Sequence, residues 1–214
     1  MYYSIIIVAA GQGIRMNLGY NKAYYRFKNN KTILQTTIEK FLNDEKCNQI
    51  VVVTDIQDYK ENINISNGKI VIVEGGASRQ ESVYNGMHAV IGDVVLVHDG
   101  ARPFVSERII EDVINTLKDN DACCVMIPIK DTLKKVKDGN IIETIDRDTV
   151  RFAQTPQGFK TQLLWTCLKK AFADNYLASD DAALIEKYSD VVVKEVIGDE
   201  SNFKITTPLD IEGL

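Results

Sequence analysis

The sequence predicts an α/β fold built on a doubly wound, mostly parallel sheet. Short apolar segments rich in Val and Ile alternate along the chain with longer segments in which apolar residues recur every three or four positions. Buried strands give the first pattern, and amphipathic helices give the second. Their alternation is typical of a parallel sheet covered by helices. The chain has 214 residues, 45% of them hydrophobic, and no internal repeat, so we expect a single domain over residues 1–214.

Five segments are expected to form the buried strands, because each is short, β-branched and flanked by polar or turn residues. They are residues 5–10, 50–54, 70–73, 94–98 and 122–128. Three segments between them have helical spacing and begin near a Ser or Thr, which are preferred N-cap residues. These predicted helices are residues 32–42, 78–90 and 106–117.

The pattern changes after residue 128. Residues 131–147 alternate loosely in hydrophobicity around Asp138-Gly139-Asn140, which favours a two-stranded hairpin. A single hairpin buries little surface, so we expect 131–147 to be a β-arm that packs against a second copy of the chain in a homodimer. The chain then returns through the polar segment 154–157 and a helical pattern at 163–173.

Composition excludes several classes of protein. The net charge of −5 provides no general attraction for nucleic acid, so we expect no nucleic-acid partner. No apolar segment approaches the roughly 20 residues of a membrane span, and the amino terminus lacks the order of an export signal. We therefore expect a cytoplasmic protein with no membrane partner. The four cysteines lack the spacing of a metal or disulfide site and are interpreted as buried thiols.

Polar or glycine-rich segments follow four of the predicted strands. These segments are residues 11–22, 75–79, 98–103 and 130–132. Open α/β sheets bind ligands at the carboxyl ends of their strands, so we expect these segments to share one edge.

The first of these segments is suited to a phosphate ligand. Gly11 and Gly13, followed by Arg15 and Lys22, are what a backbone cradle for a polyphosphate needs. Met16 stands where a dinucleotide fingerprint has its third glycine, and no Gly-Lys-Ser/Thr follows, so the two commonest phosphate loops are excluded. Two glycines after a strand also occur in a simple tight turn.

Three further segments each have a functional and a purely structural interpretation. Asp99 follows a buried strand, where a carboxylate would bind Mg²⁺ beside phosphate groups, but Asp-Gly is also a common turn. Gly75-Gly76 would let a flat ligand approach the backbone, but they also suit the entry to a capped helix. Ser179-Asp180-Asp181 is interpreted first as a helix start and second as a binding pair.

Taken together and in order, these motifs resemble the 2-C-methyl-D-erythritol 4-phosphate cytidylyltransferase family. The resemblance extends from Ile5 to about Asp210. The motifs that carry it are AAGQGIRM (9–16) with NK (21–22), GG (75–76) with Arg79 and Ser82, HDGARPF (98–104), KDT (130–132), DR (146–147), QTPQGF (154–159) and NFKITTP (202–208).

The resemblance implies transfer of the cytidylyl group of CTP to 2-C-methyl-D-erythritol 4-phosphate, on a Rossmann-like sheet of the nucleotidyltransferase type. It also implies Mg²⁺ as cofactor and a homodimer in which the hairpin arm reaches the site of the partner. By position, the catalytic residues around the α-phosphate would be Arg15, Lys22 and Lys204. The CTP-binding residues would be Ala9, Ala10, Gly11, Gly13, Gly76, Arg79, Ser82, Asp99 and Gly100, with Asp99 holding the metal. The acceptor-binding residues would be Thr132, Arg147, Ser179, Asp180 and Thr206.

Two alternatives remain open from the sequence. A ribitol-5-phosphate cytidylyltransferase shares the nucleotide half of the site, although Ala-Ala-Gly at 9–11 and Asp146-Arg147 favour the first family. A catalytically silent nucleotide sensor on the same fold is expected to have lost a cation or the metal carboxylate. Arg15, Lys22, Asp99 and Lys204 are all present.

Overall fold

The computed structural model describes residues 1–11 and 19–212 and contains a seven-stranded sheet with the order β3-β2-β1-β4-β8-β5-β9. The strands are β1 (Tyr3–Val8), β2 (Cys47–Thr54), β3 (Ile70–Glu74), β4 (Val94–Asp99), β5 (Ala122–Pro128), β8 (Arg151–Lys160) and β9 (Lys194–Ile197). All neighbouring pairs are parallel except those of β8, which runs antiparallel to β4 and β5. The predicted α/β class with a mostly parallel sheet is confirmed.

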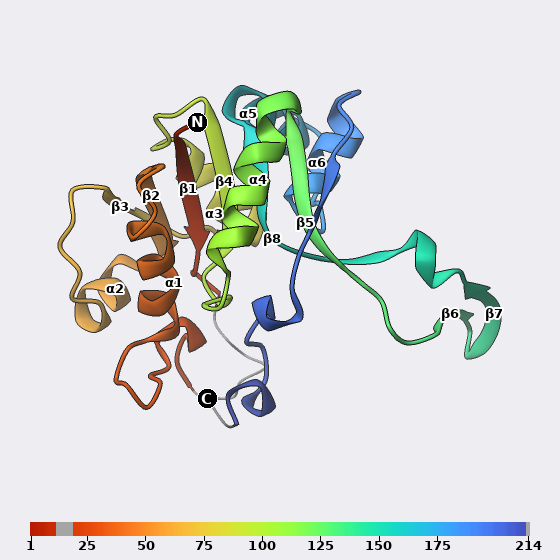
Figure 1. The fold of residues 1–214 in the computed structure, drawn as a ribbon, viewed down its shortest axis with the longest axis horizontal. Helices are drawn as coiled ribbons and strands as arrows, with labels where there is room; N and C mark the ends of the chain where they lie inside the picture. The colour runs from red at the N-terminus through yellow and green to blue at the C-terminus, as the bar shows by residue number, and fades with distance from the viewer. Residues whose placement is uncertain (12–18, 213–214) are drawn as a thin grey trace.

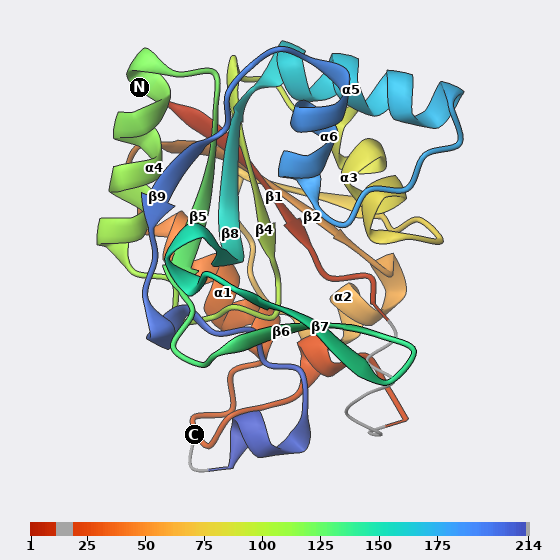
Figure 2. The same cartoon turned by 90° about the vertical axis from the view of Figure 1, so that its right-hand side faces the viewer.

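Helices cover both faces of the sheet (Figures 1 and 2). One face is covered by α1 (Ile33–Leu42), α2 (Ile56–Asn62) and α4 (Glu107–Asp119), and the other by α3 (Arg79–Met87), α5 (Thr161–Ala173) and α6 (Asp181–Tyr188). Alternation along β1 divides the core accordingly, because Ile5 and Ile7 join the first hydrophobic cluster whereas Ile6 joins the second.

The predicted helix starts are confirmed by their caps. The side chains of Thr32, Ser78 and Ser106 accept hydrogen bonds from the backbone amides of Gln35, Glu81 and Ile109. Each bond satisfies one of the amides that a helix leaves without a partner in its first turn.

Three elements lie outside the predictions. β8 includes segment 154–157, whose polar residues and proline are unusual for a central strand; here those polar side chains are buried and hydrogen-bonded. α2 buries only Tyr59, so its sequence has little helical periodicity. β9 has four residues, of which only Val196 is buried.

The predicted hairpin is confirmed as a separate two-stranded sheet of β6 (Leu133–Lys137) and β7 (Asn140–Ile145), which projects from the rest of the chain (Figure 1). Asp138 and Gly139 have φ values of 49° and 79°, as a type I′ turn requires. Three apolar side chains on the hairpin are exposed: Val136 (57%), Ile141 (67%) and Ile142 (56%).

The four cysteines are free and buried, as the sequence predicts. Burial raises the pKa of Cys47, Cys123 and Cys124 to about 12, so these thiols stay protonated at neutral pH. Among the helices of the described ranges, none has the length and apolar character that crossing a membrane requires.

Candidate active site

A cavity of about 740 Å³ lies beyond the carboxyl ends of β1, β3 and β4. Most of the predicted catalytic and CTP-binding residues line it: Ala9, Ala10, Gly11, Lys22, Gly76, Arg79, Ser82, Asp99 and Lys204. Gly13 and Arg15 lie outside the described residues. Gly100 is not among the described residues that line the cavity. The structure therefore brings together side chains that are up to about 200 positions apart in the sequence, because parallel strands end at one edge.

The loop after β3 is held closely against the loop after β1. A Cβ atom added to Gly75 would overlap the Cβ atom of Ala10, so this approach requires glycine. The Ser82 hydroxyl accepts a hydrogen bond from the Gly76 amide (3.1 Å) and donates one to the Ser78 carbonyl (2.9 Å). Ser82 thus fixes the loop that forms one wall of the cavity.

Gly100 packs against the end of β1 and the residue that follows it. Its amide donates to the carbonyl of Val8 (2.9 Å), and an added Cβ would lie 3.0 Å from the Cβ of Ala9. A side chain at position 100 would therefore require the loops that follow β1 and β4 to move apart by a few tenths of an ångström.

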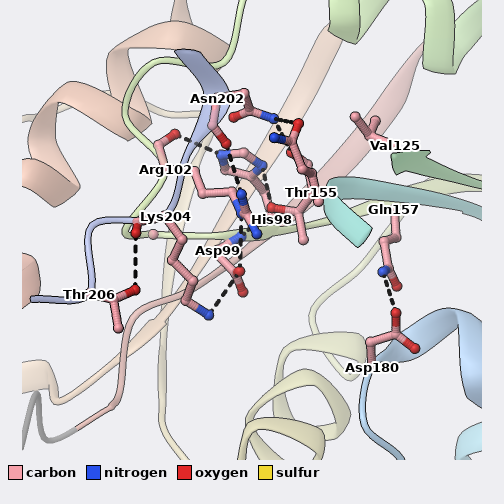
Figure 3. A network of polar contacts seen from close by, with 12 residues as sticks. His98, Asp99, Arg102, Val125, Thr155, Gln157, Asp180, Asn202, Lys204 and Thr206 are labelled. Atoms are coloured by element: carbon pink, nitrogen blue, oxygen red, sulfur yellow. Dashed lines mark hydrogen bonds and ion pairs between the residues drawn. The ribbon is translucent and has the colours of Figure 1, made fainter. Parts of the chain in front are cut away.

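Three basic side chains pair with the carboxylate of Asp99, and Figure 3 shows two of them, Arg102 and Lys204. The Asp99 side chain pairs with Lys204 Nζ at 2.9 Å, Arg79 Nε at 3.3 Å and Arg102 Nε at 3.4 Å. Only 6% of the residue is exposed. Burial opposes ionisation, but the charges of Arg79, Lys204 and Arg102 outweigh it and hold the pKa of Asp99 well below its usual value.

A chain of hydrogen bonds fixes the backbone around Asp99 (Figure 3). The Arg102 carbonyl can only accept, so the neutral His98 imidazole donates to it from Nε2 (3.0 Å). His98 Nδ1 then accepts from the Thr155 hydroxyl (3.0 Å), whose oxygen accepts from the Asp99 amide (3.0 Å). The chain needs neutral His98, and burial lowers the pKa of His98 to about 4.

The carboxyl-terminal segment is tied to the same network through Asn202, at the end of the 3₁₀ turn η4 (Glu200–Asn202). Arg102 Nη1 donates to the Asn202 carbonyl (2.8 Å), and Asn202 Nδ2 donates to the Thr155 carbonyl (2.8 Å). These contacts place Lys204, two residues further on, beside Asp99. Arg102, Thr155 and Asn202 could not be assigned a role from the sequence, because only the fold shows that β8 carries Thr155 to this edge.

Lys22 reaches the cavity from the 3₁₀ turn η2 (Lys22–Tyr24). Asn21 caps this turn by accepting from the Ala23 amide (3.0 Å), and it donates to the Ala9 carbonyl (2.6 Å). Lys22 Nζ donates to the Ile205 carbonyl (2.7 Å). Lys22 is therefore held between the loop after β1 and the segment that carries Lys204.

Arg79 has a second acidic partner, Asp181, which was not predicted as a site residue. Its Nη1 lies 2.8 Å from Oδ2 of Asp181, the first residue of α6, which is 1% exposed. Burial raises the pKa of Asp181, and the charge of Arg79 partly opposes this shift. In sequence, Asp181 resembles any acidic residue in a first helical turn.

The predicted acceptor-binding residues lie in two places. Ser179 and Asp180 line a smaller cavity of about 120 Å³ that shares Ser78 and Arg79 with the larger one. Asp180 also caps α6 and accepts from Gln157 Nε2 (2.8 Å).

The other three of these residues lie outside both cavities as the described residues define them. The Thr206 hydroxyl donates to the Lys204 carbonyl (3.0 Å). Thr132 precedes β6 and Arg147 follows β7, so both lie at the base of the hairpin arm, where both are exposed. Arg147 Nη1 donates to the Lys130 carbonyl (2.8 Å). Within one chain, the arm residues are therefore not brought to the cavity of 740 Å³.

Chemically, the larger cavity suits a ligand with several negative charges. Lys22, Arg79 and Lys204 supply fixed positive charge, and the glycine-rich loops supply close backbone contact. Asp99 offers hard oxygen ligands to a divalent cation. Among residues 1–11 and 19–212, no cluster of three or more His, Cys, Asp or Glu could hold a metal, so water or substrate oxygens would supply the remaining ligands.

Comparison with known proteins supports the same assignment. A family model described as 2-C-methyl-D-erythritol 4-phosphate cytidylyltransferase matches residues 3–213. A protein of that name from Clostridioides difficile (strain 630) is 42% identical, with 98% of this chain and 90% of the relative covered. Another from Bacillus licheniformis is 39% identical and covers 99% of this chain and 93% of the relative.

Solved structures agree with these sequence relatives. The crystal structure of 4-diphosphocytidyl-2C-methyl-D-erythritol synthase from Anaerococcus prevotii has a TM-score of 0.88 and 33% identity, covering 99% of this chain and 93% of that one. The Francisella tularensis 2-C-methyl-D-erythritol 4-phosphate cytidylyltransferase has a TM-score of 0.87 and 30% identity, covering 99% and 97%. The chain thus belongs to the 2-C-methyl-D-erythritol 4-phosphate cytidylyltransferase family.

Proposed function

We propose that this chain transfers the cytidylyl group of CTP to 2-C-methyl-D-erythritol 4-phosphate, giving 4-diphosphocytidyl-2-C-methyl-D-erythritol and pyrophosphate. Family membership supports the reaction. The observation that carries it is the convergence of Lys22, Arg79 and Lys204 with Asp99 on one cavity. A triphosphate needs several fixed cations, and three separate segments of the chain supply them here.

The reaction is an in-line displacement at the α-phosphorus of CTP. A phosphate oxygen of the acceptor forms a new bond to this phosphorus, and the bond to the bridging oxygen of the β-phosphate breaks. The attacking oxygen is already deprotonated, so no general base is required. Two anions must approach each other, and Lys22, Lys204 and Arg15 would lower the barrier by positioning them and by stabilising negative charge.

Asp99 is the residue proposed to hold Mg²⁺. Asp99 lines the cavity that would contain the phosphates, which fits a cation usually bound by one or two carboxylates plus substrate phosphate oxygens. When bound, the cation would supply charge neutralisation for the triphosphate. Asp99 pairs with Lys204, Arg79 and Arg102 in this structure, so holding a cation requires it to give up part of these contacts.

The nucleoside is proposed to lie against the loops after β1 and β3. Ala9, Ala10, Gly11 and Gly76 present backbone there, and Arg79 and Ser82 lie at the start of α3. Ser179, Asp180 and Thr206 are proposed to face the acceptor. Arg79 and Ser78 connect the two cavities, which supports binding of both substrates side by side.

A homodimer formed through the hairpin arm is part of the proposal. The exposed apolar side chains of Val136, Ile141 and Ile142 on β6 and β7 give the arm a surface suited to a second copy. Thr132 and Arg147 lie on this arm, outside the cavity of their own chain. The arm of one subunit would then bring both residues to the acceptor bound by the partner.

The function is tested by measuring pyrophosphate release from CTP and Mg²⁺ with each acceptor in turn. Release with 2-C-methyl-D-erythritol 4-phosphate, at a kcat/KM well above that with ribitol 5-phosphate, is expected. A preference for ribitol 5-phosphate would contradict the acceptor assignment. Binding of CTP without release in either mixture would identify a silent nucleotide sensor and contradict the proposed activity.

A further inference from the structure

Arg79 separates the two cavities and is held by a carboxylate on each side. Its side chain lines both cavities, whereas Asp99 lines only the larger one and Asp181 only the smaller one, as far as the described residues define them. Arg79 presents Nε to Asp99 Oδ1 at 3.3 Å and Nη1 to Asp181 Oδ2 at 2.8 Å. Two edges of one planar guanidinium are thus fixed by two chain segments about 80 residues apart, which restricts its rotation.

Asp181 is not needed as a helix cap. The cap of α6 is Asp180, whose side chain accepts from the Ala183 amide (3.0 Å). Asp181 is 1% exposed. Within the described part of the chain, its Oδ2 accepts no hydrogen bond of acceptable geometry, and it forms an ion pair with Arg79. A buried carboxylate is costly unless a charge compensates it, so its presence here is coupled to Arg79.

We propose that Asp181 is a positioning residue that acts through Arg79: it fixes the guanidinium at the border of the nucleotide cavity and keeps it from pairing with Asp99 alone. This inference relies on the proposed function for the identity of the nucleotide. Asp99 already pairs with Lys204 and Arg102, so a third cation bound only to it would further neutralise the carboxylate proposed to hold Mg²⁺. By sharing Arg79, Asp181 leaves Asp99 more available.

The test is calorimetric binding of CTP in the presence of Mg²⁺, together with steady-state kinetics, for D181N. The substitution keeps the shape of the side chain and removes its charge. We expect the Kd and KM for CTP to rise about tenfold, because Arg79 would lose the ion pair that holds its Nη1, with a much smaller change in kcat. E186Q is the matched control, because it makes the same chemical change at an exposed position of α6 and should leave the Kd unchanged.

A double-mutant cycle with R79Q separates positioning from a general effect on α6. R79Q alone leaves Asp181 buried without its cation, so R79Q/D181N should melt at a higher temperature than R79Q. In the R79Q background, D181N should cause no further change in the Kd for CTP. A persisting change would show that Asp181 acts on the fold and not through Arg79, and would overturn the proposal.

CTP binding by the wild type and by D181N separates the role of Asp181 from the proposed function. If the wild-type protein does not bind CTP, the proposed function is contradicted. If the wild type binds CTP and D181N binds it equally well, only the role of Asp181 is contradicted. The double variant has no unpaired buried carboxylate, so its comparison with R79Q remains informative if D181N alone is unstable.

Discussion

His98 shows how a single buried side chain makes the site dependent on pH. Its neutral imidazole links the Arg102 carbonyl to the Thr155 hydroxyl, and that hydroxyl accepts from the Asp99 amide. A charged imidazole would donate from both nitrogens, so Thr155 could no longer donate to it. Protonation of His98 is therefore expected to disturb the loop that carries Asp99.

Acidification should lower the stability of the protein through His98. An unfolded His98 binds a proton near pH 6.5, whereas in the folded chain burial lowers its pKa to about 4. This contribution to the free energy of unfolding is complete above pH 6.5 and decreases as the pH falls towards 4, by about 3 kcal/mol in all. Urea unfolding at a series of pH values measures it.

Two variants show whether His98 causes this pH dependence of unfolding. H98N cannot titrate and should lose this part of the pH dependence, whereas H88N, at an exposed position, should retain it. Equal pH dependence in H98N and the wild type would contradict the role assigned to His98.

Among the structural elements, the loop between β3 and α3 depends most on the absence of a side chain. G75A should destabilise the protein by about 1–3 kcal/mol and weaken CTP binding, because the added methyl group would overlap Ala10 and push the two loops apart. G68A is the control, since an added Cβ there has open space around it. Thermal unfolding and CTP calorimetry of both variants measure the effect, and equal behaviour of the two would contradict the close approach.

The same elements show what local sequence can predict. The strands of the first half and the capped helices follow from hydrophobic periodicity and from Thr32, Ser78 and Ser106. β8 was missed because a central strand is expected to be apolar, whereas Thr155 and Gln157 face polar partners that only the fold supplies. α2 and β9 were missed because each buries too little to leave a periodic pattern.

Part of the candidate site could be predicted from the sequence, as part of the fold could. Lys22 and Asp99 stand in motifs at the ends of predicted strands, and Lys204 stands in a motif marked by the family resemblance; all three line the cavity. Asp181 could not be identified, because its ionic partner Arg79 lies about 100 positions earlier in the sequence and the pairing depends on how α6 packs. Contacts between distant segments need the tertiary structure.

For the assembly, the proposal that the arm works across subunits predicts complementation. K22A removes a cation from the cavity, and R147A removes one from the arm. In a randomly mixed dimer population, half of the dimers combine both variants and contain one site with its cavity and its arm intact, so activity should recover to roughly a quarter of the wild-type value. Pyrophosphate release from the mixed and the separate preparations measures it, and no recovery on mixing would contradict an arm that acts on the partner.

The single-turnover rate of K22A with saturating CTP, Mg²⁺ and acceptor tests the role of the converging cations most directly. Lys22 is proposed to stabilise charge at the α-phosphate, so its removal should lower the rate by about 10²–10³-fold with a smaller change in CTP affinity. K28A, at an exposed position six residues away, should retain the wild-type rate. A K22A rate close to that of the wild type would contradict the claim that the cations converging on this cavity carry the reaction.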